Sequence, residues 1–312
     1  MQKRKKTYIF GFFISFFTAI LTFGALIIQK VANIKPKNPQ IVIDRERKNG
    51  FFNEEEFNSL PKKEVQIDSP FGYKIDAVLI EKFNNNKFMI FSHGVTENKL
   101  SSVKYMKIFL DLGYNAIIYD HRRHGKTGGK YTSYGHYEKY DLQAIVQWLI
   151  KEKGEDISLG IHGESMGAAT AILYAGSLED RADFYIFDCP FSNFGELYRH
   201  LTKTQTPFPF PIIKVLSDFF IPVSARYRIQ DVAPINYIDQ ISKPALFIHS
   251  AEDTFIPPYM TIQLYEKKVG DKELYIAPHG KHAQSYPDNR EEYIEKIKGF
   301  LNKYVNKNKV ED

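Results

Sequence analysis

Hydrophobic and polar positions along the chain fall into blocks that predict strands and helices in alternation. Residues 64–69 and 73–81 flank the turn PFG in a pattern that predicts an antiparallel hairpin. Five short apolar runs predict buried strands, namely KFMIFSHG at 87–94, YNAIIYD at 114–120, DISLGIHG at 156–163, FYIFDCP at 184–190 and PALFIHS at 244–250.

Apolar side chains at helical spacing lie between these predicted strands. Residues 99–112 predict one helix, and a second, capped by Gly154, is predicted from the shared face of Leu142, Ile145, Val146, Leu149 and Ile150. A last amphipathic helix is marked by Ile294, Ile297, Phe300, Leu301 and Tyr304. This alternation is typical of a mostly parallel sheet flanked by helices, so we predict an α/β fold.

Residues 1–30 form a separate segment, in which a basic run precedes an apolar one. Residues 7–28 carry no charge, and as a helix they would extend ~33 Å, enough to cross a hydrocarbon core of ~30 Å. The following ALIIQKVANIKP has no A-x-A cleavage site, so we predict an uncleaved transmembrane helix. Secretion after signal-peptide cleavage is the alternative.

Charge placement predicts the orientation of this helix. Four cations precede the apolar run directly, at Lys3, Arg4, Lys5 and Lys6, while later ones are sparser, at Lys30, Lys35 and Lys37. We therefore expect a single-pass protein of the cell membrane, with its N-terminus inside and its folded domain outside the cytoplasm. The four leading cations supply most of the net charge of +5, so no broad basic face remains for nucleic acid.

The remaining chain predicts one folded domain. Residues 31–60 are interpreted as a tether and lead-in, because 33–50 is polar and contains two prolines. The folded domain is expected over 61–307, with a tail at 308–312.

Neither a metal nor a cofactor is predicted. The pairs His121/His124 and His279/His282 lack a clear third ligand nearby. The sequence contains no G-x-G-x-x-G fingerprint and no P-loop motif, so no redox or nucleotide cofactor is expected. The single cysteine, Cys189, rules out an intrachain disulfide.

The candidate chemistry centres on GESMG at 163–167. A G-x-S-x-G motif between a predicted strand and an alanine-rich helix predicts a nucleophile elbow that exposes Ser165. A serine nucleophile needs a base and a carboxylate that orients the base. Asp253 follows the predicted strand 244–250, and His282 lies in a loop before the final helix. Their chain order, Ser, Asp, His, is the order expected for such an elbow.

Other residues compete for these roles. Glu252 and His279 have the same chemistry as their neighbours Asp253 and His282, and Asp188 also ends a predicted strand. We interpret Asp188 as a structural hydrogen-bond anchor, and Glu164 as a solvated or ion-paired residue.

Backbone donors for an oxyanion are expected beside the serine. One is the N–H of Met166, directly after the nucleophile, and the other is the N–H of Val95, after His93 and Gly94.

Together these motifs resemble the α/β-hydrolase superfamily, in particular its membrane-linked bacterial esterase-like branch of BEM46 and YqkD-type serine hydrolases. The resemblance covers about residues 64–304 and rests on SHGVTEN, YDHRRHGKTGG, GIHGESMGAAT, FDCPFSN, PALFIHSAEDTFIP and GKHAQSY, in that order. It implies Ser165 as nucleophile, His282 as base and Asp253 as orienting acid. The chain departs from the family pattern at two places: Glu164 stands where many relatives have histidine, and the acid loop begins HSAED where many begin with HG. Neither departure removes a catalytic group, but the resemblance therefore implies no particular substrate.

The resemblance also implies a cap insertion at about residues 194–240. Its segment TPFPFPIIKVLSDFFIP is rich in proline and phenylalanine. Four aromatic side chains either line an acyl pocket or join the cap to the body, namely Phe208, Phe210, Phe219 and Phe220.

These observations predict a membrane-anchored serine hydrolase that cleaves carboxylic esters of a small-molecule or lipid-like acyl substrate through an acyl-enzyme. An amidase or peptidase with the same triad, and a non-catalytic binding scaffold on the same fold, are the alternatives.

Overall fold

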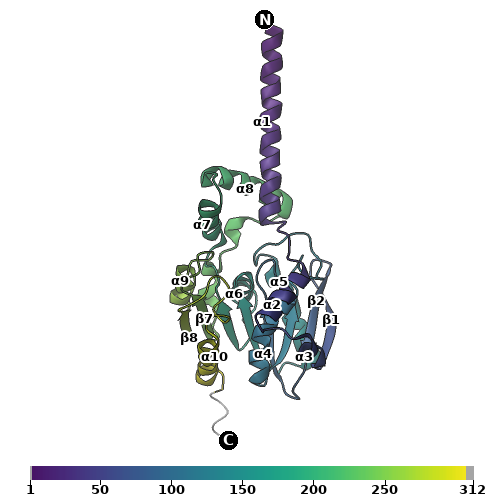
Figure 1. Cartoon of the computed structure of the whole chain (residues 1–312), viewed down its shortest axis with the longest axis vertical. Coiled ribbons are helices and arrows are strands. Elements are labelled where there is room, and N and C mark those ends of the chain that lie inside the picture. The colour runs from purple at the N-terminus through teal and green to yellow at the C-terminus, as the bar shows by residue number, and fades with distance from the viewer. Residues whose placement is uncertain (1, 307–312) are drawn as a thin grey trace.

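The computed structural model describes residues 2–306, with side chains from residue 11 onward, so the predicted tail 308–312 lies outside the described residues. A long helix, α1 (Gln2–Val31), projects from a rounded body (Figure 1). In the described part of the chain, one helical stretch, Gly11–Val31, is long and apolar enough to cross a membrane. Several of its large side chains are exposed, among them Phe12, Phe13, Phe16 and Phe17.

The body is built on one eight-stranded sheet in the order β1-β2-β4-β3-β5-β6-β7-β8. Its strands are β1 (Lys62–Asp68), β2 (Lys74–Ile80), β3 (Lys87–Ser92), β4 (Asn115–Tyr119), β5 (Ser158–Glu164), β6 (Phe184–Asp188), β7 (Ala245–Ser250) and β8 (Lys272–Ala277). Strand β2 runs antiparallel to β1 and β4, and all other neighbours are parallel. This confirms the predicted hairpin and the mostly parallel sheet.

Helices cover both faces of the sheet, as predicted. On one face the core includes residues of α5 (Glu138–Lys153), α6 (Met166–Ser177) and α9 (Tyr259–Lys267). On the other it includes residues of α4 (Val103–Asp111) and α10 (Arg290–Tyr304). The predicted helix 99–112 is divided into a 3-10 turn at Lys99–Ser102 and α4. Strand β8 was not predicted, because only two of its six residues are buried at the sheet edge.

The segment interpreted as a tether contains two helices that pack on the body. They are α2 (Pro39–Lys48) and α3 (Glu54–Ser59), whose N-terminal amides are capped by the side chains of Asn38 and Asn53. Phe51, Phe52 and Phe57 are buried against the sheet face that α4 covers. The capping pattern was present in the sequence, but the two prolines and the charge run obscured it.

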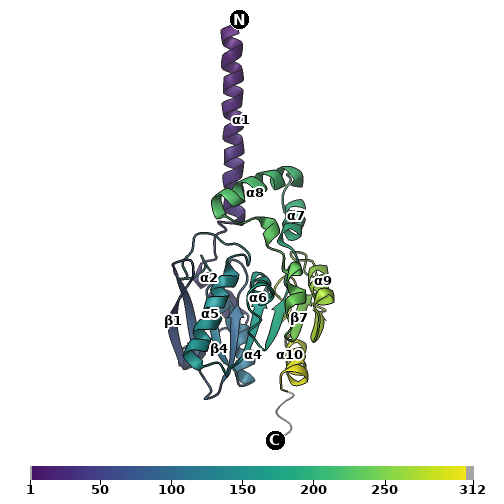
Figure 2. The ribbon, with the colours of Figure 1, turned by 180° about the vertical axis from the view of Figure 1, so that it is seen from behind.

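The predicted cap lies between β6 and β7, at the foot of α1 (Figure 2). It contains α7 (Phe194–Gln205), α8 (Phe210–Ala225) and 3-10 turns at Ile229–Asp231, Pro234–Asn236 and Ile238–Gln240. Ile27 and Val31 of α1 share one buried apolar cluster with cap residues and with Met166 and Ala169 of α6. This cluster fixes the base of α1 and the cap above the carboxyl ends of the strands.

Candidate active site

Ser165 occupies the sharp turn between β5 and α6. Its backbone, at φ 56° and ψ −116°, is in a region that non-glycine residues seldom adopt. A Cβ on Gly163 would lie 2.5 Å from the Cα of Ala168, and one on Gly167 would lie 1.9 Å from the carbonyl oxygen of Ser92. Both glycines of the motif are therefore required by close backbone packing around the serine.

The structure brings Ser165, His282 and Asp253 into one hydrogen-bonded chain. His282 Nε2 lies 2.9 Å from Ser165 Oγ, and His282 Nδ1 lies 2.7 Å from Asp253 Oδ2. Because an ionised carboxylate can only accept, we assign the imidazole proton to Nδ1. Nε2 is then free to accept the serine proton.

Asp253 is held by more than His282. Its Oδ1 accepts hydrogen bonds from the N–H groups of Phe255 and Ile256, both at 2.9 Å. Its Oδ2 lies 3.1 Å from Nε2 of His249, a buried histidine of β7 that sequence reasoning missed. Burial would raise the pKa of Asp253, but hydrogen bonds from His249 and His282 outweigh it and hold that pKa well below its usual range. The carboxylate is thus kept ionised.

The loop after β3 lies directly against the serine. A Cβ on Gly94 would lie 3.6 Å from the Cβ of Ser165. Among the described residues, neither the backbone N–H of Val95 nor that of Met166 has an acceptor. These are the two donors predicted to bind an oxyanion.

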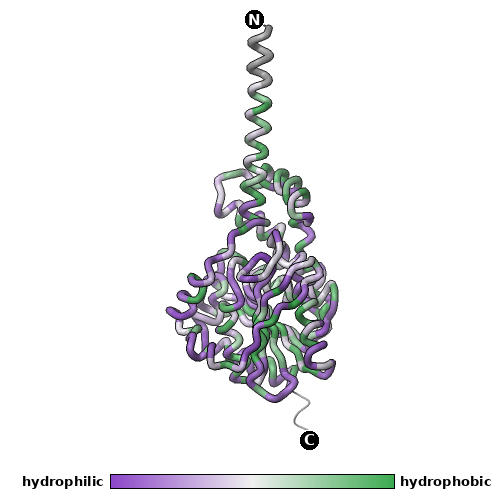
Figure 3. The backbone as a smooth tube through the Cα atoms, turned by 90° about the vertical axis from the view of Figure 1, so that its right-hand side faces the viewer, coloured by the Kyte–Doolittle hydropathy of each residue, from purple (hydrophilic) through white to green (hydrophobic). Residues whose placement is uncertain are grey.

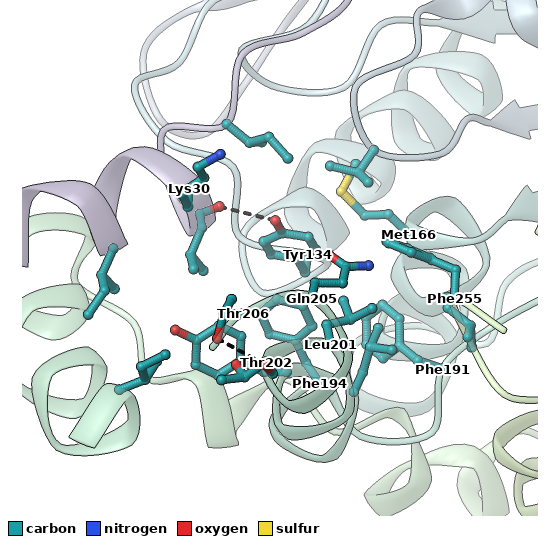
Figure 4. A pocket seen from close by; sticks show the side chains of 18 of the residues that line it. Lys30, Tyr134, Met166, Phe191, Phe194, Leu201, Thr202, Gln205, Thr206 and Phe255 are labelled. Carbon is teal, nitrogen blue, oxygen red and sulfur yellow. Dashed lines mark hydrogen bonds between the residues drawn. The ribbon is translucent and has the colours of Figure 1, made fainter. Parts of the chain in front are cut away.

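Two cavities meet at Ser165, and Val95 and Phe255 also line both. The first, which we call the apolar cavity, measures about 460 Å³ and is bounded by α1, α7, α8 and the elbow. In Figure 4, Met166 and Phe255 lie toward one side of it and Lys30 of α1 toward the other. The second, the polar cavity, measures about 500 Å³ and contains Lys37, Arg45, Glu97, Lys104 and Lys281.

Comparisons with known proteins identify the family. Residues 84–232 match the family described as serine aminopeptidase, S33. YqkD of Bacillus subtilis (strain 168), described as uncharacterized, is 45% identical over 285 residues, which cover 91% of this chain and 93% of YqkD. This chain belongs to the α/β-hydrolase superfamily, in the same family as YqkD.

Two further comparisons connect this α/β-hydrolase with enzymes. The lysophosphatidylserine lipase ABHD12 of Danio rerio is 27% identical over 177 residues, covering 55% of this chain and 44% of ABHD12. This chain therefore matches less than half of that relative. The structure of the Pyrococcus furiosus esterase Pf2001 superposes with a TM-score of 0.66 at 25% identity, over 81% of this chain and 96% of the esterase. The fold is thus of the esterase type.

The four cap phenylalanines have different surroundings in this α/β-hydrolase. Phe208 lines the apolar cavity. Phe210 packs on Tyr198 of α7, and Phe220 packs against α1 at Gly24. Phe219 is 61% exposed. The aromatic character of the segment gave no means of telling these positions apart.

The competing carboxylates lie outside the hydrogen-bonded chain. Asp188 accepts hydrogen bonds from Ser285 and Tyr293, each at 3.0 Å, while burial and the charge of Glu164 raise its pKa to about 6. Glu164 is buried and ion-paired with Lys104 at 2.9 Å. Glu252 accepts from the N–H of Gly280 at 3.2 Å.

Three side chains near Ser165 are of kinds that can bind a metal ion. Cys189, Asp253 and His282 each place one ligand atom within 4.8 Å of the others. However, Asp253 and His282 already bind each other, and burial raises the pKa of the Cys189 thiol far above its usual value. Because that hydrogen bond occupies both side chains, we assign Asp253 and His282 to the hydrogen-bonded chain with Ser165.

A neutral histidine holds the loop that carries Val95. His124 Nδ1 donates to the carbonyl of Arg122 at 2.8 Å, and its Nε2 accepts from the N–H of Thr96 at 3.0 Å. Burial and the neighbouring His93 lower the pKa of His124 to about 3. A protonated His124 would lose the acceptor that fixes the loop.

This predicts a pH-dependent loss of stability. Between the ordinary histidine pKa of about 6.5 and the folded value, only the unfolded chain binds this proton, so stability falls on acidification. His124→Gln retains an acceptor but does not titrate. When the pH falls from about 6.5 to about 5, the free energy of unfolding should decrease in both proteins. The decrease should be about 2 kcal/mol smaller for the variant than for the wild type. Urea unfolding at both pH values measures this, and equal losses would contradict it.

Proposed function

We propose that this α/β-hydrolase is a membrane-anchored serine hydrolase that cleaves carboxylic esters through an acyl-enzyme. The observation that carries the proposal is the hydrogen-bonded chain from Ser165 through His282 to Asp253, with the serine at the junction of the two cavities. An ordinary serine hydroxyl is a poor nucleophile, and this arrangement supplies a base for its proton and an acid to orient that base.

The reaction follows from this geometry. Ser165 Oγ attacks the ester carbonyl carbon as His282 Nε2 takes the serine proton. The N–H groups of Val95 and Met166 stabilise the resulting oxyanion. His282 then returns the proton to the departing alcohol as the carbon–oxygen bond breaks and the acyl-enzyme forms. Water, activated by His282, attacks the acyl-enzyme and releases the acid and free Ser165.

The two cavities suggest where each part of a substrate would bind. The apolar cavity, lined by Phe191, Phe194 and Leu197 among others, suits an acyl chain. The polar cavity suits the alcohol portion, because it also reaches Ser165 and its lining carries charged side chains. A lipid-like ester is also consistent with the activity named for ABHD12.

The anchor proposal rests on α1. Its apolar length fits a bilayer, and Phe23, Leu26 and Val31 line the apolar cavity. Cleavage as a signal peptide would remove this wall, so the arrangement favours retention over secretion. The denser cations before the span favour an N-terminus inside and a body outside the cytoplasm.

Asp253→Asn is expected to lower the turnover of an ester by about 10³- to 10⁴-fold, because the amide would hold His282 in the wrong tautomer. Glu252→Gln is the matched control, since this neighbouring carboxylate accepts a hydrogen bond from the N–H of Gly280, and it should retain the wild-type rate. The measurement is kcat/KM on a p-nitrophenyl ester. A reversed order of the two variants would refute the assignment.

A matched amide separates ester hydrolysis from the amidase alternative, which the serine aminopeptidase family name keeps relevant. The wild type should cleave a p-nitrophenyl ester and leave the p-nitroanilide of the same acyl group intact. Turnover of the anilide would instead support an amidase or peptidase, since those enzymes also cleave activated esters.

A further inference from the structure

Helix α8 of the cap presents a continuous apolar stripe to its surroundings. Ile212, Val215, Phe219 and Val223 follow one another at spacings of three or four residues, and their side chains are 59%, 68%, 61% and 68% exposed. Such spacing places all four on one side of the helix. The charged pair Lys214 and Asp218 lies beside the stripe.

The opposite side of α8 packs against the rest of the protein. Ser217, Ile221 and Ala225 are buried, and the last two join the cluster that contains Ile27 of α1. The exposed stripe is therefore a second apolar surface, one that packing against the body does not use. A contiguous exposed apolar surface in a folded domain marks an interaction site.

The position of α8 along α1 indicates what covers the stripe. The ring of Phe208 lies 5.2 Å from that of Phe23, and Phe220 abuts Gly24. Phe23 and Gly24 stand five and four residues before Ile28, the last residue of the apolar run, which is ~6–8 Å along the helix. Helices that lie at a membrane surface bury their apolar faces to ~5–10 Å.

The direction of α8 agrees with this depth. It runs across the foot of α1 rather than along it (Figures 1 and 2), so it would lie in the plane of a membrane that α1 crosses. In Figure 3, apolar colouring occurs both along α1 and in the cap beside its base.

The apolar cavity connects this level with the serine. Its lining includes Phe23 and Phe208 at the level of α8, and Ser165 and Met166 at the elbow. Helices α1 and α8 thus form two of its walls.

We propose that α8 lies in the interfacial layer of the bilayer that α1 spans, so that the apolar cavity receives an acyl chain directly from the membrane. The substrate is then an ester with at least one long acyl chain, held in the bilayer before cleavage. This inference rests on the membrane anchor and the ester hydrolysis proposed above.

The first test measures the depth of α8 in the full-length chain, reconstituted in phosphatidylcholine–phosphatidylglycerol vesicles. The chain has one tryptophan, Trp148 on α5 of the body, which serves as an internal control. In Val215→Trp, lipids with brominated acyl chains should quench about half or more of the fluorescence that the added tryptophan contributes. The fluorescence of the wild type, which comes from Trp148, should change little. Equal quenching in both proteins would overturn the proposal.

The second test measures delivery of the substrate. Val215 and Val223 do not line the apolar cavity. Val215→Asp/Val223→Asp should therefore lower hydrolysis of a long-chain ester in vesicles by about tenfold or more, while a soluble butyrate ester is cleaved within about twofold of wild type. The matched control is Val269→Asp, because Val269 is 56% exposed and lies in the turn before β8. It should leave both rates unchanged.

The outcomes are distinct. Unchanged hydrolysis of both esters in the double variant would overturn delivery from the bilayer. If the tryptophan introduced on α8 is not quenched and α8 helices cross-link to one another, a second copy of the chain covers the stripe instead. If the wild type cleaves no ester while that introduced tryptophan is quenched, the placement of α8 stands and ester hydrolysis fails.

Discussion

Replacing Ser165 with alanine is expected to lower ester turnover by at least about a thousandfold. The variant keeps the cavities and the hydrogen bond between His282 and Asp253, but it has no oxygen to attack the carbonyl. No acyl-enzyme can then form at residue 165. Because serine, base and acid act as a unit, His282→Ala should cost a similar factor, and combining the two should add little.

The matched control is Ser192→Ala. Ser192 is buried, donates to Gln263 at 2.7 Å and lies outside both cavities that meet at Ser165. Its variant should turn over ester at nearly the wild-type rate. Steady-state kinetics of the purified proteins provide the comparison. Retained turnover in Ser165→Ala would exclude this serine as the nucleophile.

The second large effect concerns stability behind the elbow. Lys104 of α4 and Glu164 form an ion pair in which the two side chains are only 5% and 6% exposed. Burial would raise the pKa of Glu164, but the charge of Lys104 and a hydrogen bond from Tyr105 lower it below its ordinary value. Lys104→Met would leave a buried carboxylate without its counter-ion, and should lower the free energy of unfolding by about 3–5 kcal/mol at neutral pH.

Two further variants separate this cause from loss of packing. Lys104→Met/Glu164→Gln removes the orphaned charge, so it should recover most of the loss. Lys107→Met removes a more exposed cation of the same helix, paired with Glu56, and should change stability by less than about 1 kcal/mol. Denaturant unfolding measures all three. If Lys104→Met unfolds like the wild type, the pair does not stabilise the fold.

The sequence was sufficient for the framework of the candidate site. Period-two and continuous apolar runs predicted the hairpin and five of the remaining strands, and the glycines around Ser165 predicted the turn between β5 and α6. The residues predicted as base and acid, His282 and Asp253, lie in the same hydrogen-bonded chain as that serine. These features depend on local sequence patterns or on the order of residues along the chain, so they can be predicted from the sequence.

Features that depend on tertiary packing could not be predicted from the sequence. His249 stands in a continuously apolar strand, and nothing in the run PALFIHS indicates that its ring reaches Asp253, four residues later. Arg45 belongs to a segment interpreted as a tether, yet it forms two hydrogen bonds with Glu97 and lines the polar cavity. Composition also could not show which faces of α8 are buried, because that depends on its contact with α1.

The most direct test of the proposed nucleophile is intact-mass analysis and peptide mapping of the full-length protein after treatment with a fluorophosphonate. We expect a single adduct on Ser165 in the wild type, and its loss in His282→Ala, because the histidine activates the serine. An adduct on another residue, or no adduct on natively folded protein, would contradict the assignment.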